Sequence, residues 1–286
     1  MDRERVVILG TKGGPSLRSA DRMPTSSLIE IGGKKVVVDC GLGVTRNLVN
    51  AGVDLAGIDF VFLTHLHSDH VLELGPMLYT AWVSGLSKEV GLYGPFGIRE
   101  YWDGFIQSMV YDIELRIGDE GRQDLRNLVR LAEYGEGDVS VPGLKVAALR
   151  VPHPPVQECY ALRFDAEGWR VTFGADTTYF PPLAEFATGS DILVHEAMLE
   201  KGVEKLVNRS RHAVRLREHI VASHTEARDV ARIAKASGSR HLVVNHLVPV
   251  DDPDISESDW IDSISAVWDG KITLGYDGLE IERSNK

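Results

Sequence analysis

Short apolar runs separated by polar turns recur along the whole chain and predict β-strands. They cover residues 6–9, 27–31, 35–40, 58–63, 90–93, 145–151, 159–164, 169–173, 191–194 and 241–246. Runs of four to eight residues, rich in β-branched and aromatic side chains, are typical of buried strands. The runs at 27–31 and 35–40 flank a Gly-Gly pair, which favours a two-residue hairpin turn.

Helical spacing of apolar positions alternates with these strands. It predicts helices near residues 44–51, 71–86 and 225–235, and shorter helical pieces at 101–106 and 124–129. We therefore expect helical insertions at 97–135 and 199–222. The aromatic residues of the first would suit a cap over a pocket, and equally ordinary outer packing. In the second, a group of basic and histidine side chains could line the pocket or form a solvated helix face: His212, Arg215, Arg217 and His219.

The turn after the strand at 58–63 carries four residues of the kinds that bind metals. Its sequence, Thr-His-Leu-His-Ser-Asp-His, places His65, His67, Asp69 and His70 within six positions. Zinc and similar ions prefer imidazole and carboxylate ligands. A cluster of this kind would be costly to bury without a compensating partner. The turn therefore predicts a metal site, with ligands for a first and a second ion.

The pattern H-x-H-x-D-H resembles the signature of the metallo-β-lactamase superfamily. The resemblance implies an α+β fold, a four-layer αββα sandwich formed by one domain over residues 1–286, with two metals at one edge. The remaining ligand types follow in the family's order, each near the end of an apolar run: His153, Asp176 and His246. By resemblance, the first metal is held by His65, His67 and His153, and the second by Asp69, His70 and His246. Asp176 and a water or hydroxide would bridge them.

Further motifs resemble the ribonuclease Z and arylsulfatase-like branch of that superfamily. They are the D-C-G-L-G that begins at Asp39, the H-E-A that begins at His195, and Ser223-His224-Thr225, which matches the branch only partly. By resemblance, Asp39 orients a ligand histidine, although a plain turn carboxylate is the alternative. His224 would be an electrostatic stabiliser or general acid oriented by Glu196, or else would cap the helix after it.

The candidate catalytic residues are therefore Asp69, His224 and Glu196, and we expect His195 to be a core histidine. One feature departs from true ribonuclease Z. Only 23 residues separate His153 from Asp176, which is room for two strands and a turn but not for the tRNA-binding arm of that enzyme.

Composition narrows the choice of partner. The 286 residues carry a formal net charge of −11, whereas proteins that bind nucleic acid usually present a basic surface. We therefore expect a small-molecule substrate and no nucleic acid. Two cysteines, Cys40 and Cys159, do not form a disulfide framework and are expected to be buried thiols. No apolar run reaches 18 residues, so no membrane helix is expected. The first residues show no signal-peptide profile, which makes the cytoplasm the expected location. A homodimer is left open.

Together these features predict a binuclear hydrolase that uses a metal-bridging hydroxide to cleave an ester, lactone, amide, or phosphate or sulfate ester. Zn²⁺ is the metal that the ligand types favour, with Mn²⁺ or Fe²⁺ as alternatives. Three other functions are considered. They are a nuclease acting on RNA 3′ ends, an iron-dependent oxidoreductase, and a metal-dependent binding protein without catalysis. The histidine at position 67, in place of an acidic ligand, speaks against the flavodiiron type of oxidoreductase.

Overall fold

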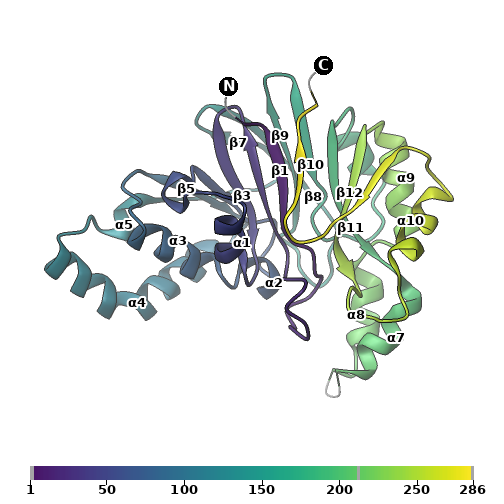
Figure 1. Ribbon diagram of the computed structural model, residues 1–286, viewed down its shortest axis with the longest axis horizontal. Helices are drawn as coiled ribbons and strands as arrows, with labels where there is room; N and C mark the ends of the chain where they lie inside the picture. The colour runs from purple at the N-terminus through teal and green to yellow at the C-terminus, as the bar shows by residue number, and fades with distance from the viewer. Residues whose placement is uncertain (1–2, 211–212, 285–286) are drawn as a thin grey trace.

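Two seven-stranded sheets form the centre of the computed structural model, which describes residues 3–210 and 213–284 (Figure 1). The first sheet contains β1 (Arg5–Gly10), β2 (Ser26–Ile31), β3 (Lys34–Cys40), β4 (Phe60–Phe62), β5 (Val90–Gly94), β6 (Val129–Glu133) and β14 (Leu279–Glu282). The second contains β7 (Gly137–Val141), β8 (Leu144–Arg150), β9 (Tyr160–Ala166), β10 (Trp169–Phe173), β11 (Ile192–Met198), β12 (His241–Val248) and β13 (Lys271–Leu274).

Each sheet is antiparallel in one half and parallel in the other. The strand orders are β14-β1-β2-β3-β4-β5-β6 and β13-β12-β11-β10-β9-β8-β7. Pairing is antiparallel from β14 to β3 and parallel from β3 to β6; in the second sheet it is antiparallel from β7 to β10 and parallel from β10 to β13. Parallel strands end at the same edge of a sheet, so the loops after β4, β10 and β11 can meet there.

Helices cover the outer face of each sheet. On the first sheet lie α1 (Val44–Asn50), a short 3₁₀ helix (Leu55–Gly57), α2 (Ser68–Val71), α3 (Leu74–Val83), α4 (Ile98–Glu120) and α5 (Leu125–Leu128). With the second sheet lie α6 (Pro182–Phe186), α7 (Glu200–Asn208), α8 (Leu216–Ser223), α9 (Ala227–Ser237) and α10 (Glu257–Ser265).

Three apolar cores separate these layers. The central core packs the inner faces of the two sheets against each other and includes Phe62, Phe164 and Val243. The outer cores lie between each sheet and its helices, around Trp82 on one side and Trp260 on the other. Alternating strand residues supply the central and outer cores in turn, as the two-residue period of a strand requires. The predicted αββα sandwich is confirmed.

Most predicted elements are present, with differences at their ends. The Gly-Gly hairpin joins β2 and β3, and both cysteines are buried free thiols. The helix expected to reach residue 86 ends at Val83, because the chain turns at Gly85 with φ of 109°. Residues 97–135 include the edge strand β6 as well as α4 and α5, and residues 199–222 contain α7 and most of α8. Strands β7, β13 and β14 were not predicted, because these short edge segments carry few apolar residues.

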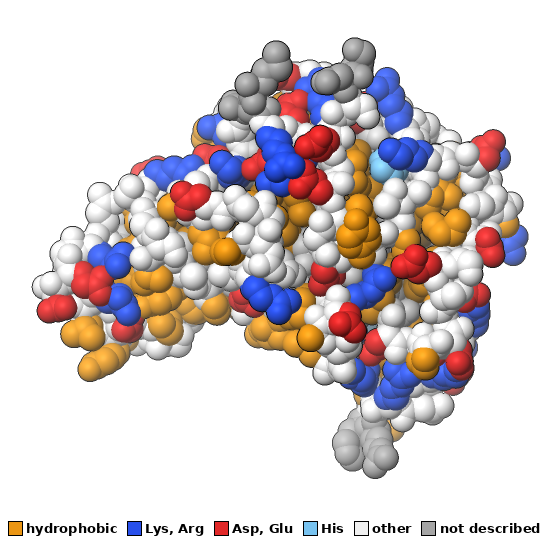
Figure 2. Space-filling view, in the orientation of Figure 1, with side chains coloured by type: hydrophobic (Ala, Val, Ile, Leu, Met, Phe, Trp, Pro, Cys, Tyr) orange, Lys and Arg blue, Asp and Glu red, His pale blue; other side chains and the backbone are white. Residues whose placement is uncertain are grey.

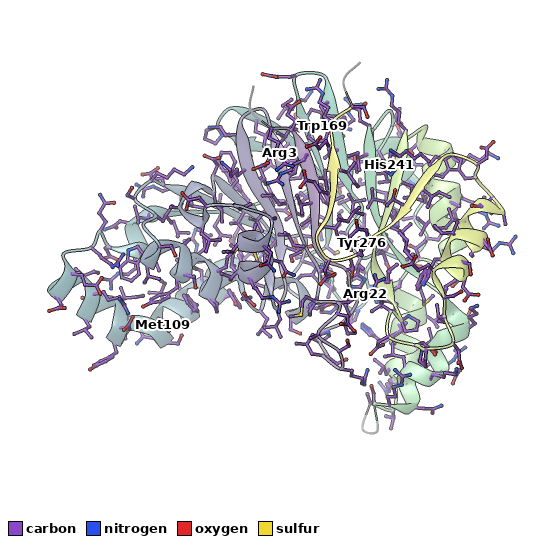
Figure 3. The ribbon with its side chains drawn as sticks, viewed as in Figure 1. Arg3, Arg22, Met109, Trp169, His241 and Tyr276 are labelled. Carbon is purple, nitrogen blue, oxygen red and sulfur yellow. The ribbon has the colours of Figure 1, made fainter. Side chains whose placement is uncertain are left out.

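The two termini lie together at one end of the sandwich, and α7 and α8 project from the other end (Figure 1). Lys and Arg side chains are intermixed with Asp and Glu on the face that Figure 2 shows. Arg3 and Trp169 lie on the side of the termini, and Arg22 lies farther from them, in the direction of α7 and α8 (Figure 3). Within the described residues, no helix has both the length and the apolar character needed to cross a membrane.

Candidate metal centre

The turn after β4 delivers the first ligand-type side chains. After Leu63 the backbone leaves the sheet, and α2 begins at Ser68 with His67 as its N-cap. His65, Asp69 and His70 are buried, and His67 is partly exposed. Because the extended residues before α2 alternate in direction, His65 and His67 point to the same side. The predicted turn is present at this strand end, and its histidine and aspartate side chains lie close together.

Bulges in two strands direct further polar side chains toward this turn. Asp39 in β3 and His246 in β12 have no paired residue opposite them, and both have positive φ values, 62° and 42°. A bulge of this kind turns a side chain out of its regular alternation. Asp and His tolerate the left-handed region better than most residues do. His246, expected at the end of the run 241–246, lies within β12 at a bulge, because the strand continues to Val248.

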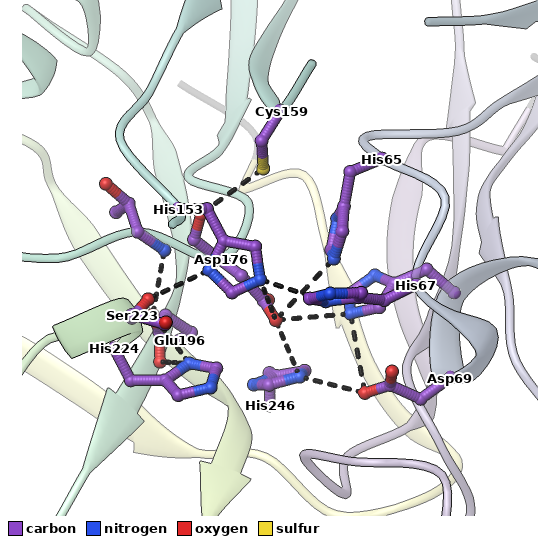
Figure 4. Close-up of polar contacts among 12 residues, drawn as sticks. His65, His67, Asp69, His153, Cys159, Asp176, Glu196, Ser223, His224 and His246 are labelled. Carbon is purple, nitrogen blue, oxygen red and sulfur yellow. Dashed lines mark hydrogen bonds and ion pairs between the residues drawn. The ribbon is translucent and has the colours of Figure 1, made fainter. Parts of the chain in front are cut away.

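Four histidines surround a single carboxylate oxygen, Oδ2 of Asp176 (Figure 4). Nε2 atoms of His70 and His246 lie 3.4 and 3.0 Å from it. Those of His65 and His153 both lie 3.9 Å from it. Asp176 lies three residues after the end of β10, and its Oδ2 faces histidines contributed by both sheets.

The side chains fall into two groups that match the predicted ligand sets. One group is His65, His67 and His153, in which Nε2 of His153 lies 3.0 Å from Nδ1 of His67. The other is Asp69, His70 and His246, in which Oδ2 of Asp69 lies 3.6 Å from Nε2 of His70 and 3.3 Å from Nε2 of His246. All seven predicted ligand residues are thus brought together.

Hydrogen bonds on the far side of three rings fix which nitrogen faces the centre. Nδ1 of His153 donates to the carbonyl of Ser223 at 2.9 Å, and Nδ1 of His70 lies 2.8 Å from Oδ2 of Asp39. Nδ1 of His65 lies 3.0 Å from the Thr64 hydroxyl. Nε2 of His65 and of His70 is buried without a hydrogen-bond partner within the described chain. Unpartnered buried nitrogens aimed at a carboxylate fit divalent metal ions.

The electrostatics of the two groups also suit a cation. Burial and the neighbouring His153 lower the pKa of His67 to about 4, so this imidazole is neutral, as a metal ligand must be. Burial alone would lower the pKa of His246, but Asp176 and Asp69 raise it to about 10. The same negative field attracts a divalent cation.

A second pair of residues, His224 and Glu196, adjoins the metal-type ligands. Nδ1 of His224 lies 3.0 and 3.1 Å from the two carboxylate oxygens of Glu196, and its ring stacks on His246 with centroids 5.3 Å apart. Oε1 of Glu196 also accepts from the backbone N–H of Thr177 and Thr225. Burial lowers the pKa of His224, but Glu196 outweighs that effect and raises it. The predicted pairing of these two side chains is present.

The position of His224 in its helix differs from the alternative that we considered. It is the C-cap of α8 and not the residue that opens the next helix, since Glu226 is the N-cap of α9. His195 is buried in β11, and its Nδ1 contacts the backbone carbonyl of Glu196. This agrees with the expected core histidine.

A cavity of about 300 Å³ opens onto this centre. Its floor includes His67, Asp69, Asp176, His224 and His246, and its opposite wall is apolar: Pro15, Leu206, Leu216, Ile220 and Val248. Of the side chains flagged in the 199–222 segment, His219 lines the cavity, whereas Arg217 pairs with Glu200 and Glu204 on the surface. His212 lies outside the described residues.

The sequence analysis assigned no role to Lys12, a charged residue that lines this cavity and precedes a glycine-rich turn. This turn contacts the site, since the N–H of Gly14 donates to Oδ2 of Asp69 at 2.8 Å. The available signal was a lysine placed directly before two glycines and after a strand.

Comparison with known proteins identifies the family. The family model described as "Anti-Pycsar protein Apyc1" matches residues 5–246. A protein named Ribonuclease Z from Mycobacterium bovis (strain BCG / Pasteur 1173P2) is 30% identical over 281 residues, which cover 97% of each chain.

Solved structures show the same fold. The metallo-β-lactamase fold protein YhfI from Bacillus subtilis superposes with a TM-score of 0.75 at 21% identity, covering 99% of this chain and 100% of that one. A diphosphatase from the PhnP family superposes with a TM-score of 0.68 at 19% identity, covering 99% and 98%. The chain therefore belongs to the family of the anti-Pycsar protein Apyc1, and it is a metal-dependent hydrolase of the ribonuclease Z-like branch of the metallo-β-lactamase superfamily.

Proposed function

We propose that this protein is a binuclear zinc phosphodiesterase that acts on a compact, small-molecule phosphodiester. The observation that carries the proposal is the convergence of the two ligand groups on Asp176, with the Glu196–His224 pair at the floor of the same cavity. The relatives named Ribonuclease Z support a phosphodiester as the bond that is cleaved.

The proposed ligands are His65, His67 and His153 for one ion and Asp69, His70 and His246 for the other, with Asp176 shared. When bound, the two ions would supply a water of lowered pKa and would offset the negative charge of the phosphodiester. Asp39 and the Ser223 carbonyl hold His70 and His153 in the tautomer that leaves Nε2 free.

His224 is the proposed general acid. Its Nδ1 is held by Glu196, so its Nε2 is the nitrogen available to the cavity. As water adds to phosphorus and the bond to the leaving oxygen breaks, protonated His224 gives its proton to that oxygen. The products are an alcohol and a phosphomonoester. Glu196 favours the protonated form before the reaction and orients the ring throughout.

The size and walls of the cavity support a compact substrate. About 300 Å³ lies at the lower end of the range for ligand pockets. Ile220 and Leu216 of α8 form part of its apolar wall. The net charge of −11 adds no attraction for a polyanion.

A nuclease acting on RNA 3′ ends is the second candidate, and the 30% identity to ribonuclease Z favours it. Only the hairpin of β9 and β10 lies between His153 and Asp176, as predicted. However, the alignment covers 97% of both chains, so neither has room for a long additional segment. The short hairpin therefore does not separate this chain from that relative, and the absence of a nucleic-acid substrate stays a prediction.

The test combines metal analysis with a substrate panel on the purified protein. The panel contains bis(p-nitrophenyl) phosphate, p-nitrophenyl phosphate, acetate and sulfate, a lactone, and a precursor tRNA with a 3′ trailer. We expect about two zinc ions per chain and selective cleavage of the small diester. In Asp176→Asn we expect a loss of roughly 10³-fold or more.

Asp59→Asn is the matched control, because this carboxylate binds Lys88 on the surface, away from the ligand groups. Efficient cleavage of the precursor tRNA with little activity on the small diester would favour the nuclease. Iron with redox activity, or two metals with no hydrolysis of any phosphodiester, would refute both candidates.

A further inference from the structure

Lys12 is a buried cation without a close carboxylate. It follows β1, its side chain is only 4% exposed, and its Nζ donates to the carbonyl of the adjacent Gly13 at 3.0 Å. Among the described residues no carboxylate oxygen lies within 4.0 Å of this ammonium group; Asp251 and Asp69 act on it from farther away. Burying an ammonium group is costly unless an anion or further acceptors compensate for it.

The side chain stands at the boundary between two cavities. One is the 300 Å³ cavity above the metal-type ligands. The other, of about 320 Å³, is lined by Lys12 together with Ser19, Asp21, Arg22, Val250, Asp251, Asp252 and Pro253. Lys12 therefore adjoins both the cavity above the metal-type ligands and the neighbouring cavity, and Asp69 of the second ligand group acts on its charge.

The backbone after Lys12 packs closely against Asp69 and His246 of the second ligand group. Gly14 donates its N–H to Asp69. A Cβ atom at Gly13 would lie 2.4 Å from Val248 Cγ2 and 2.9 Å from His246 Cε1, so no larger residue fits there. The glycines let this turn pack directly on Asp69 and His246. This contact fixes the backbone position of Lys12, the residue before the glycines.

We propose that Lys12 binds a non-bridging phosphoryl oxygen of the substrate, on the side of the site formed by Asp69 and His246. This inference rests on the proposed function. A lysine ammonium is a compact point charge suited to phosphate, and Nζ has two N–H groups beyond the one that Gly13 uses. Substrate binding would supply the anion that this buried cation lacks.

The alternative is a structural role, in which Lys12 only offsets the charge of Asp251. The two roles differ in what a neutral replacement changes. A phosphate-binding lysine contributes to affinity for a phosphoryl anion, whereas a structural lysine contributes to the stability of the turn and leaves that affinity unaltered.

The test measures binding of inorganic phosphate to the metal-loaded protein by isothermal titration calorimetry, for the wild type, Lys12→Met, Lys12→Gln and Lys12→Arg. Lys88→Met is the matched control, since Lys88 is an exposed lysine that pairs with Asp59. We expect Lys12→Met and Lys12→Gln to raise the Kd for phosphate by ~10-fold or more, with unchanged metal content, and Lys12→Arg to fall between them and the wild type.

A Kd within about twofold of the wild type in Lys12→Gln, with a lowered midpoint of unfolding, would overturn the inference and assign the structural role. A wild-type protein that binds no phosphate would overturn it as well. Because this readout needs no turnover, it is separable from the proposed function. Phosphate binding that depends on Lys12, in a protein that cleaves no diester, would leave the anion site standing and refute only the phosphodiesterase.

Discussion

Replacing Asp39 by asparagine tests whether a residue that is not itself a proposed ligand controls metal binding through its hydrogen bond to His70. The carboxylate is buried and accepts from the N–H of Thr64 at 2.8 Å, from the Thr64 hydroxyl at 2.9 and 3.0 Å, and faces Nδ1 of His70 at 2.8 Å. Asparagine tolerates the positive φ of 62° at this bulge. The substitution therefore removes charge and acceptor capacity without adding backbone strain.

The size of the effect follows from the count of donors. Asparagine has one oxygen and one NH₂ group where the carboxylate has two oxygens. If the oxygen keeps the Thr64 N–H, the NH₂ group faces His70 Nδ1, and two donors meet unless His70 moves its proton to Nε2. That tautomer blocks the nitrogen that faces Asp176. We expect zinc affinity to fall by ~10- to 100-fold, equivalent to about 1.4–2.7 kcal/mol.

The assay is a zinc competition titration against a chelator, followed by activity as a function of free zinc. Asp59→Asn serves as the control, because Asp59 is remote from the ligand groups and accepts from Lys35 and Lys88. Saturating zinc should restore most of the activity of Asp39→Asn. A variant with wild-type zinc affinity would refute the reasoning and would make Asp39 a plain turn carboxylate, the alternative that the sequence left open.

Two further outcomes are expected. Glu196→Gln should keep its metal content but lose ~100-fold or more in kcat, because Glu196 raises the pKa of His224; an unchanged pH–rate profile would contradict this. Burial and Lys271 lower the pKa of His241 to about 4 from its ordinary 6.5, so the unfolded chain takes up a proton that the folded chain does not. The contribution of His241 to the unfolding free energy of the metal-free protein should therefore fall by about 1–2 kcal/mol between pH 6.5 and 4, after a discount for solvent screening of this half-buried ring. His241 is the first residue of β12. His241→Asn should flatten that decline in denaturant titrations, and equal slopes would refute the assignment.

Local sequence determined the side chains and most of the strands at the metal centre. The H-x-H-x-D-H turn after an apolar strand defines four ligand types by itself, because strand alternation and a following helix fix their directions over a few residues. His153 and Asp176 could be found in the same way, since each follows an apolar strand. These patterns span only a few residues, so they can be recognised in the sequence without knowing which distant residues pack against them.

Tertiary structure decided which of these groups meet and which nitrogen each ring presents. The bulges at Asp39 and His246 arise from pairing with neighbouring strands, so no local pattern reveals them. The same holds for His224, which ends α8, and for Lys12, whose burial depends on segments more than 200 residues away, around Leu247 and Asp251. Contacts between distant segments depend on how two sheets pack against each other, and a periodicity read along one segment carries no information about that packing.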